Sequence, residues 1–238
     1  MDTFWLMQDY YTAYLREIRQ ISESSIAHYF DALKWISRFL CEKGLINSSI
    51  FEVADLSQLQ SLRDIVFKSN EFKELNARGH QMYSSALNNY IRFAEAHDFS
   101  GLSQKLPLLD RPIPAPNEAI DVHNTWKRSA IIRNQVLEAV DYRCEIDSTH
   151  KTFIMNRTHH PYAEGHHIIG LSKQSTISHS LDIYANIICL CPLCHRFLHY
   201  GTVQDKRPIV AMLYMQRADR LAKSGIKLSK KEFERLVL

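Results

Sequence analysis

Residues 191–199 read CPLCHRFLH, and this stretch decides the fold. It joins a Cys-x-x-Cys pair, Cys191 and Cys194, to a His-x-x-x-His pair, His195 and His199. Eight of the twelve histidines and four of the five cysteines lie between residues 144 and 199. Because cysteine and histidine are the usual soft metal ligands, this concentration indicates metal binding, and the two spacings predict two kinds of site.

The sulfur-rich pattern predicts a structural zinc ion. Cys191 and Cys194 are spaced to place two thiolates on one tetrahedral ion, and Cys144 is the expected third ligand. The fourth ligand is either His150 or Asp147. We favour His150, because three cysteines and one histidine are a common zinc set, whereas aspartate is less usual among thiolates. The alternative is a pair of reduced, buried cysteines without a metal.

A nitrogen-rich site is predicted beside the first one. On a helix, His195 and His199 lie one turn apart on the same face, where both imidazoles can bind one divalent ion. Pro192 favours a helix that begins near this point. His166 and His167 lie in an extended-looking run, so their side chains should point to opposite faces of a strand. One of them can join the metal while the other acts as a base; a solvated surface is the alternative.

Together these residues resemble the His-Asn-His (HNH) endonucleases, whose ββα-metal unit is two strands and a helix around one divalent ion. The matching order is His166-His167 on a first strand, Asn186 at a second strand, and the Cys-x-x-Cys-His-x-x-x-His run opening a helix. The match extends to the zinc-containing subgroup, whose pattern includes the run CEIDSTHKTF at residues 144–153. In that run the histidine, His150, is the expected ligand. The resemblance covers about residues 125–203.

The resemblance implies a role for each residue. His167 would be the general base that takes a proton from water, and His166, His195 and His199 would hold the catalytic divalent cation. Asn186 would orient the base or its loop through its amide, with a purely loop-capping role as the alternative. Many relatives carry aspartate where this chain has His166, so the ion stays open between Mg²⁺, Mn²⁺ and a softer transition metal. Ligation by nitrogen alone favours the softer ions.

The basic residues near the second pattern are candidates for contact with DNA. Arg196 lies beside His195, and Lys206 and Arg207 open a basic segment: residues 201–238 carry nine Lys and Arg against four Asp and Glu, while the whole chain has a net charge of +3. Such a segment can lie along a phosphate backbone. Solvated helix faces are the alternative.

Composition places the chain among ordinary soluble proteins, with 45% hydrophobic and 23% charged residues in a length of 238. No apolar run approaches the roughly 20 residues that cross a membrane, and no signal peptide opens the chain. Five cysteines, an odd number and mostly in a ligand pattern, favour a reducing compartment. We therefore expect a cytoplasmic protein without a membrane partner.

The predicted fold class is α+β, mostly α. Residues 1–105 are expected to form a helical domain for DNA recognition or dimerisation, residues 106–122 a proline-rich linker, and residues 123–238 an HNH nuclease domain with a structural zinc and C-terminal helices. Apolar periodicity and capping residues predict helices at about residues 5–18, 26–40, 56–69, 79–97, 124–140, 207–224 and 229–238.

The sequence thus predicts a metal-dependent DNA endonuclease, of a restriction or phage-defence type, that uses one metal ion and His167. Its partner would be double-stranded DNA, and a homodimer is expected because cutting both strands generally needs two active sites. The alternatives are a homing or recombination-linked nuclease and a catalytically inactive zinc-stapled DNA-binding module. His167 beside an intact ligand set favours the enzyme, because a pure binding module has no use for a base there.

Overall fold

The structure is a computed structural model that describes residues 2–99, 107–115, 126 and 128–238. The chain forms two compact units, Met1–Pro107 and Leu108–Leu238. The predicted domain boundaries fall partly on residues 106 and 116–125, which lie outside the described residues, so those boundaries stay a prediction. Within the described ranges, no helix combines the length and apolar character that crossing a membrane would require.

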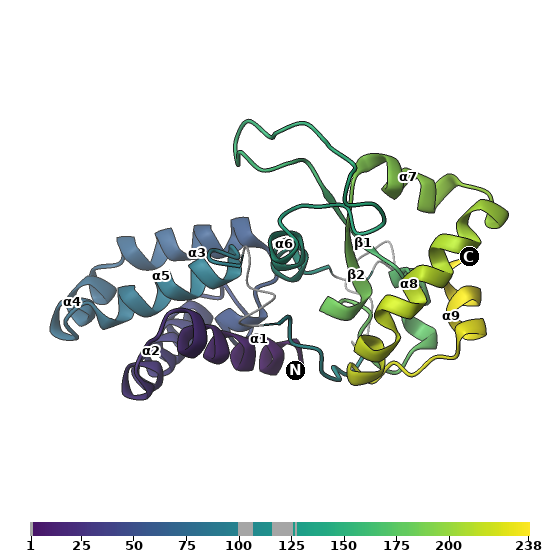
Figure 1. The fold of residues 1–238 in the computed structure, drawn as a ribbon. Helices are drawn as coiled ribbons and strands as arrows, with labels where there is room; N and C mark the ends of the chain where they lie inside the picture. Colours follow the sequence, from purple (N-terminus) through teal and green to yellow (C-terminus); the bar gives the residue numbers. More distant parts are fainter. Residues whose placement is uncertain (1, 100–106, 116–125, 127) are drawn as a thin grey trace. The chain divides into compact units, whose positions relative to one another are not determined.

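The first unit is built from helices, drawn in purple to blue in Figure 1. Its elements are α1 (Asp2–Ala13), which continues as the π-helix η1 (Tyr14–Ile18), then α2 (Glu23–Glu42), the short 3-10 helix η2 (Ile50–Glu52), α3 (Leu56–Lys68), α4 (Asn70–Arg78) and α5 (Met82–Ala94). Ser22 caps α2 as expected, because its side chain accepts a hydrogen bond from the backbone N–H of Ser25.

Two features of this unit differ from the prediction. No sequence pattern predicted α4, which begins directly after α3. Ser69 is the C-cap of α3 and, as the N-cap of α4, accepts a hydrogen bond from Phe72 N. The helix expected from residue 79 begins only at Met82, since His80 and Gln81 adopt left-handed backbone angles, with φ of 49° and 66°.

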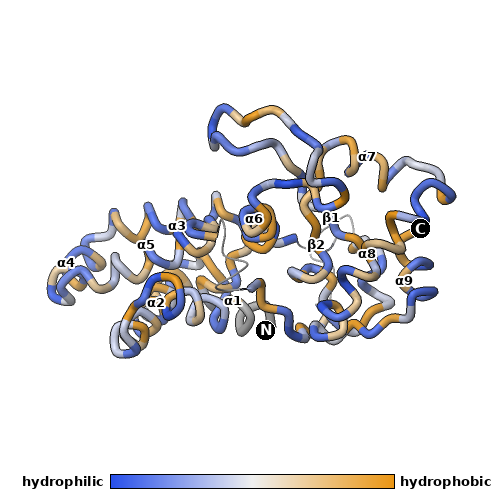
Figure 2. The backbone as a smooth tube through the Cα atoms, viewed as in Figure 1, coloured by the Kyte–Doolittle hydropathy of each residue, from blue (hydrophilic) through white to orange (hydrophobic). Residues whose placement is uncertain are grey.

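Aromatic side chains fill the core of the first unit, in agreement with the periodicity of its sequence. Tyr11, Tyr90 and Phe93 are fully buried, and the ring centroids of Tyr11 lie 5.3 Å from those of Tyr90 and of Phe93. Figure 2 shows hydrophobic and hydrophilic positions alternating along these helices, the pattern of amphipathic helices around a shared core.

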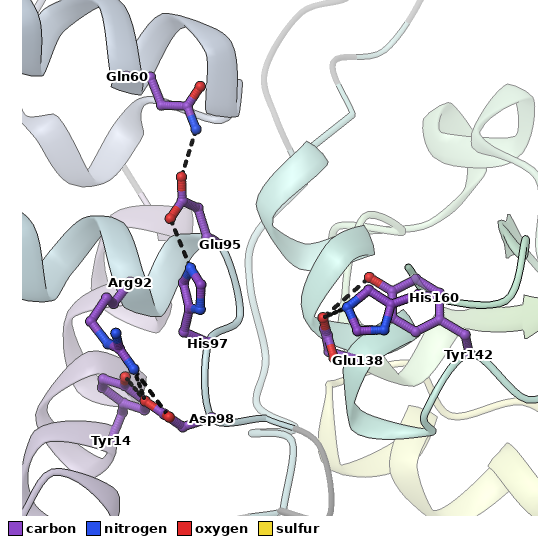
Figure 3. Close-up of polar contacts among 9 residues, drawn as sticks. All are labelled: Tyr14, Gln60, Arg92, Glu95, His97, Asp98, Glu138, Tyr142 and His160. Atoms are coloured by element: carbon purple, nitrogen blue, oxygen red, sulfur yellow. Dashed lines mark hydrogen bonds and ion pairs between the residues drawn. The ribbon is translucent and has the colours of Figure 1, made fainter. Parts of the chain in front are cut away.

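Polar contacts hold the end of α5 in place (Figure 3). Asp98 accepts a hydrogen bond from Tyr14 Oη at 3.0 Å and from Arg92 Nη2 at 3.0 Å. Glu95 accepts from Gln60 Nε2 at 2.5 Å, and its second oxygen lies 3.2 Å from His97 Nε2. The segment after α5 is therefore tied to both α3 and η1.

The second unit is a two-stranded hairpin with helices. Strand β1 (Glu164–His167) pairs antiparallel with β2 (Ile187–Leu190), with His166 opposite Ile188 and His167 opposite Ile187. The helices are α6 (Ala130–Ala139), α7 (Pro192–Tyr200), α8 (Val203–Lys223) and α9 (Lys230–Val237), with 3-10 turns η4 (Leu171–Thr176) and η5 (Tyr184–Asn186) between the strands. A mostly helical region followed by two strands and a helix is the predicted α+β class, arranged as a ββα unit (Figure 1).

Capping residues explain where these helices begin. Pro192 occupies the first turn of α7, as expected. The helix predicted at residues 124–140 starts at Ala130, because Ser129 is its N-cap and accepts from Ile132 N; residues 124, 125 and 127 lie outside the described ones. Thr202 caps α8, which starts four residues before the predicted position, and Ser229 opens α9 with a capping box.

Two further contacts stabilise the second unit. Arg220 of α8 donates to Asp110 through Nε at 2.6 Å, which connects the proline-rich segment at Asp110 to α8 within this unit. Glu138 of α6 accepts from Tyr142 Oη at 3.2 Å and lies 3.4 Å from His160 Nε2, while the Tyr142 and His160 rings stack (Figure 3). The long segment between Cys144 and β1 is thereby fixed to α6.

Candidate functional site

Three cysteines and one histidine converge in the second unit. One ligand atom from each of Cys144, His150, Cys191 and Cys194 lies within 4.8 Å of the other three. The Sγ atoms of Cys191 and Cys194 each lie 3.4 Å from Nδ1 of His150. This cluster is the predicted sulfur-rich set, and it suggests a structural zinc site.

Of the two candidates for the fourth ligand, His150 belongs to the cluster. Asp147 is not part of the cluster; its carboxylate lies 3.3 Å from Nε2 of His150, on the far side of that ring from the thiols. The same carboxylate accepts from Thr149 N at 2.9 Å. Asp147 therefore contacts the histidine of the cluster instead of joining the cluster.

The surroundings of Cys144 suit a zinc ligand, whereas burial raises the pKa of the neighbouring Cys194. Burial by itself raises the pKa of Cys144, but backbone N–H groups of Cys191, Asp147 and Ile146 outweigh burial and bring the pKa down to about 7. Zinc binds the thiolate form, so a thiol that loses its proton near neutral pH suits it. The N–H of Cys194 also points at Cys191 Sγ, at 3.4 Å.

Glu145 holds the segment that carries Cys144 in place. Its Oε2 accepts from Cys189 N in β2 at 2.7 Å, and its own N–H donates to Cys189 O at 2.9 Å. Its Oε1 accepts from Arg217 of α8, which is 4% exposed. Arg217 lies in the basic segment that was a candidate for contact with DNA. It is buried instead, and through Glu145 it holds the segment that carries Cys144.

Three histidines form the second predicted cluster. His166 comes from β1, and His195 and His199 come from α7; one nitrogen of each lies within 4.8 Å of the others. The ring centroids are 4.8 to 5.0 Å apart, and the rings stand nearly perpendicular to one another. This arrangement arises because β1 and α7 pack together and the two helical histidines are one turn apart. It suggests a site for a divalent metal ion.

These imidazoles are suited to ligation at neutral pH. Burial lowers the pKa of His166 to about 3, with further lowering by His195 and His199, and burial also lowers the pKa of His199. The neutral ring is the form that binds metal. Nδ1 of His195 lies within ion-pair distance of Glu164 Oε2, although the approach is not in a hydrogen-bonding direction.

His167 points to the other face of β1, as the strand alternation predicted. Its Nε2 lies 2.8 Å from Oδ1 of Asp182, and both side chains are 15% exposed. His166, His167 and His199 nevertheless line one cavity of about 320 Å³. Two of the three triad histidines and His167 thus share one space, whereas the third, His195, is not among the residues that line it.

Besides the histidines, Gly170 and Ser172, the cavity is lined by cationic and apolar side chains. Lys173 of η4, Lys206 of α8 and Arg235 of α9 contribute positive charge, and no Asp or Glu side chain from the described part of the chain lines the cavity. The apolar part of the wall consists of Ile168, Leu198, Val210, Leu236, Val237 and Leu238. A phosphate is a chemically suitable occupant of such a space.

Asn186 is the last residue of η5, directly before β2, and is fully buried. Its Nδ2 donates to Ile169 O and Leu181 O, both at 2.9 Å, and its Oδ1 accepts from Ile169 N at 2.9 Å. Asn186 thus fastens both ends of the loop between the strands. This loop follows His167, so the geometry agrees with an orienting role through the loop; the catalytic assignment stays a prediction.

The three residues predicted to contact DNA differ in their surroundings. Arg196 is exposed, with its guanidinium 5.9 Å from the ring centroid of Tyr200. Arg207 is 63% exposed and 4.0 Å from Glu234. Lys206 is 8% exposed, and its ammonium donates to Leu198 O at 3.3 Å, at the end of α7. Its visible role is therefore structural, and DNA contact by all three stays a prediction.

Sequence reasoning missed Asp182, Glu164, Lys173 and Arg235. Glu164 lies on the same face of β1 as His166, two residues away, which is a signal that alternation supplies. For the other three no local pattern exists, because they reach the site only through the loop between the strands and through α9.

Among known proteins, a distant sequence match agrees with the expected restriction-type nuclease. No protein-family model matches the chain, and no solved structure matches it. Over 100 residues the chain is 32% identical to the type IV methyl-directed restriction enzyme EcoKMcrA of Escherichia coli (strain K12). That match covers 42% of this chain and 33% of the enzyme, so the chain spans only about a third of its relative's length.

Proposed function

We propose that this protein is a metal-dependent DNA endonuclease of the restriction type. The observation that carries the proposal is the shared cavity, where His167 from one face of β1 meets His166 and His199 from the other. Histidines able to hold a metal ion, beside an imidazole that can act as a base, are the parts that phosphodiester hydrolysis requires. The distant similarity to a restriction enzyme supports the same reaction class.

In this proposal His166, His195 and His199 hold a divalent ion. When bound, that ion supplies Lewis-acid stabilisation of the phosphate oxygens and of the leaving 3′ oxygen. Three imidazole ligands favour Mn²⁺, Co²⁺ or Ni²⁺ over Mg²⁺. His167 takes the proton from the attacking water, since neutral imidazole is an effective base near pH 7.

The cations around the cavity bind the DNA backbone. Lys173 and Arg235 line the cavity and carry full positive charge, so they are placed to bind the scissile phosphate or its neighbour. Arg196 on α7 and Arg207 on α8 are also exposed, and in this proposal they contact the DNA backbone outside the cavity. The substrate is double-stranded DNA, and two copies of the chain act together where both strands are cut.

The structural zinc supports the site without taking part in the chemistry. Cys194 and His195 are neighbours in α7, so an ion held by Cys144, His150, Cys191 and Cys194 fixes the first turn of the helix that presents His195 and His199. Its role is to hold the triad in register with β1.

Target choice is assigned to the first unit and to the methylation state of the DNA. The nuclease unit reads backbone phosphates, which carry no sequence information directly. The relative is named as methyl-directed, so modified DNA is the first substrate to examine.

The test is nicking of supercoiled plasmid, prepared from methylating and non-methylating hosts, with Mg²⁺, Mn²⁺, Co²⁺ or Ni²⁺ and with EDTA. We expect metal-dependent nicking that His167→Ala lowers by at least about 100-fold. End sequencing of the products reports the target and its modification.

The same experiment separates the alternatives. Retarded DNA migration without nicking under any metal identifies a catalytically inactive DNA-binding module. Cleavage at one long target sequence, independent of methylation, identifies a homing or recombination-linked nuclease instead of a restriction enzyme.

A further inference from the structure

We propose that Asp182 is the positioning residue of the general base, and that it holds His167 in the tautomer with the proton on Nε2, which leaves Nδ1 to accept a proton from water. This inference rests on the proposed nuclease function. It concerns a residue that no sequence pattern singled out and that lies fifteen positions beyond His167 in the chain.

The geometry places the carboxylate directly against the base. Oδ1 of Asp182 lies 2.8 Å from Nε2 of His167, which is hydrogen-bonding distance. The side chains of both residues are 15% exposed. Solvent therefore screens this contact far less than it screens an exposed ion pair.

The carboxylate is itself held in position by its second oxygen. Oδ2 accepts from the backbone N–H of Ser129 at 2.6 Å, at the N-cap of α6, and Asp182 N donates to Ser180 Oγ at 3.2 Å. A chain of contacts thus runs from α6 through Asp182 to His167.

This series of hydrogen bonds determines which nitrogen of His167 carries the proton. An ionised carboxylate only accepts hydrogen bonds, so the ring must present N–H at Nε2 and a lone pair at Nδ1. In the reaction, a proton moves from water to Nδ1, the remaining hydroxide oxygen bonds to phosphorus, and the bond from phosphorus to the 3′ oxygen breaks. The leaving oxygen then takes a proton from solvent water. Asp182 stabilises the imidazolium that forms.

Asparagine at this position provides a discriminating variant. Asp182→Asn keeps an oxygen for Ser129 N but offers N–H groups to His167, which favours the opposite tautomer. We expect kcat for plasmid nicking to fall on the order of 1,000-fold, with DNA affinity and zinc content unchanged. Asp219→Asn, an exposed change of equal charge on α8, is the matched control and should leave kcat unchanged.

Two further measurements separate positioning from a merely structural role. Nitrogen-15 NMR of the histidine rings, with the His167 signals assigned by their loss in His167→Ala, should show the Nε2–H tautomer in the natural protein and Nδ1–H in Asp182→Asn. In a His167→Ala background, Asp182→Asn should cause no further loss of the residual activity, because its effect passes through His167.

Three results would overturn the inference: an unchanged kcat in Asp182→Asn, an equal fractional loss in the His167→Ala background, or an Nδ1–H tautomer in the natural protein. Failure of the natural protein to nick DNA with any metal is a different result. It would remove the nuclease proposal and the catalytic role of Asp182 with it.

Discussion

Asp147 lies 3.3 Å from Nε2 of His150, while Nδ1 of the same ring faces the thiols of Cys191 and Cys194 at 3.4 Å. Asp147 and His150 were the two candidates for the fourth zinc ligand. His150 faces the thiols, and Asp147 contacts the outer nitrogen of His150. A carboxylate on the outer nitrogen fixes the tautomer of a ligating histidine and raises its basicity.

Substitution of these two residues should therefore have unequal effects. We expect His150→Ala to lose zinc and, with it, the folded second unit, because zinc binding supplies folding free energy in such sites. Asp147→Asn should retain one zinc per chain but bind it roughly 10- to 100-fold more weakly. Zinc release to a chromogenic chelator, measured together with circular dichroism, checks both. Equal zinc loss in the two variants would make Asp147 a ligand.

Removal of the Asn186 amide should affect stability before it affects chemistry. Asn186→Ala leaves two buried carbonyls and one buried N–H without their partner, and each unpaired group costs roughly 1–3 kcal/mol. We expect a loss of about 3 kcal/mol or more in the free energy of unfolding, measured with urea. Nicking should fall in proportion to the loss of the ordered loop. Full stability combined with lost nicking would show direct catalysis instead.

Local patterns made much of this architecture predictable. Each of the two predicted patterns belongs to one element. The alternation of His166 and His167 is found in β1, and the spacing from Cys191 to His199 is found at the start of α7 and along it. Asp182 and Arg235 reach the site through tertiary folding, for which no local period exists. The basic count of the C-terminal segment was misleading for Arg217, because a count of charges does not distinguish a surface from a buried pair.

The metal preference should change with the character of one ligand. His166→Asp replaces a nitrogen donor by a carboxylate, so we expect nicking with Mg²⁺ and Mn²⁺ to rise relative to nicking with Co²⁺ and Ni²⁺. The ratio of rates across the four ions is the measurement, and zinc content controls for folding. An unchanged ratio would mean that position 166 does not ligate the catalytic ion.

The cavity cations should contribute separately to the salt dependence of DNA binding. Each phosphate contact contributes about 0.9 to the slope of log K against log salt concentration. Lys173→Ala and Arg235→Ala should each reduce that slope by about 0.9, whereas Lys231→Ala, on α9 but outside the cavity lining, should leave it unchanged. Fluorescence anisotropy at several salt concentrations gives the slopes. Equal slopes for all three variants would place the DNA elsewhere.

Gly165 tests how closely α6 must approach β1 beside His166 and His167. A Cβ added at Gly165 would overlap Cγ of Arg133 and lie 3.0 Å from its Cδ, so the arginine stem occupies the space that a side chain would need. Because Cγ is near the backbone of α6, it cannot move away as easily as the end of the side chain. We expect Gly165→Ala to lower the free energy of unfolding by about 1–3 kcal/mol and to slow nicking through displacement of the strand.

Truncation of the arginine should reverse that effect. In Gly165→Ala combined with Arg133→Ala, the overlap disappears, so we expect most of the lost stability to return even though the double variant has lost the Arg133 stem. Urea unfolding of both single variants and the double variant gives the coupling energy between the two positions. Additive losses of stability would show that Gly165 is needed for the conformation of the β1 backbone, and not to make room for the Arg133 side chain of α6.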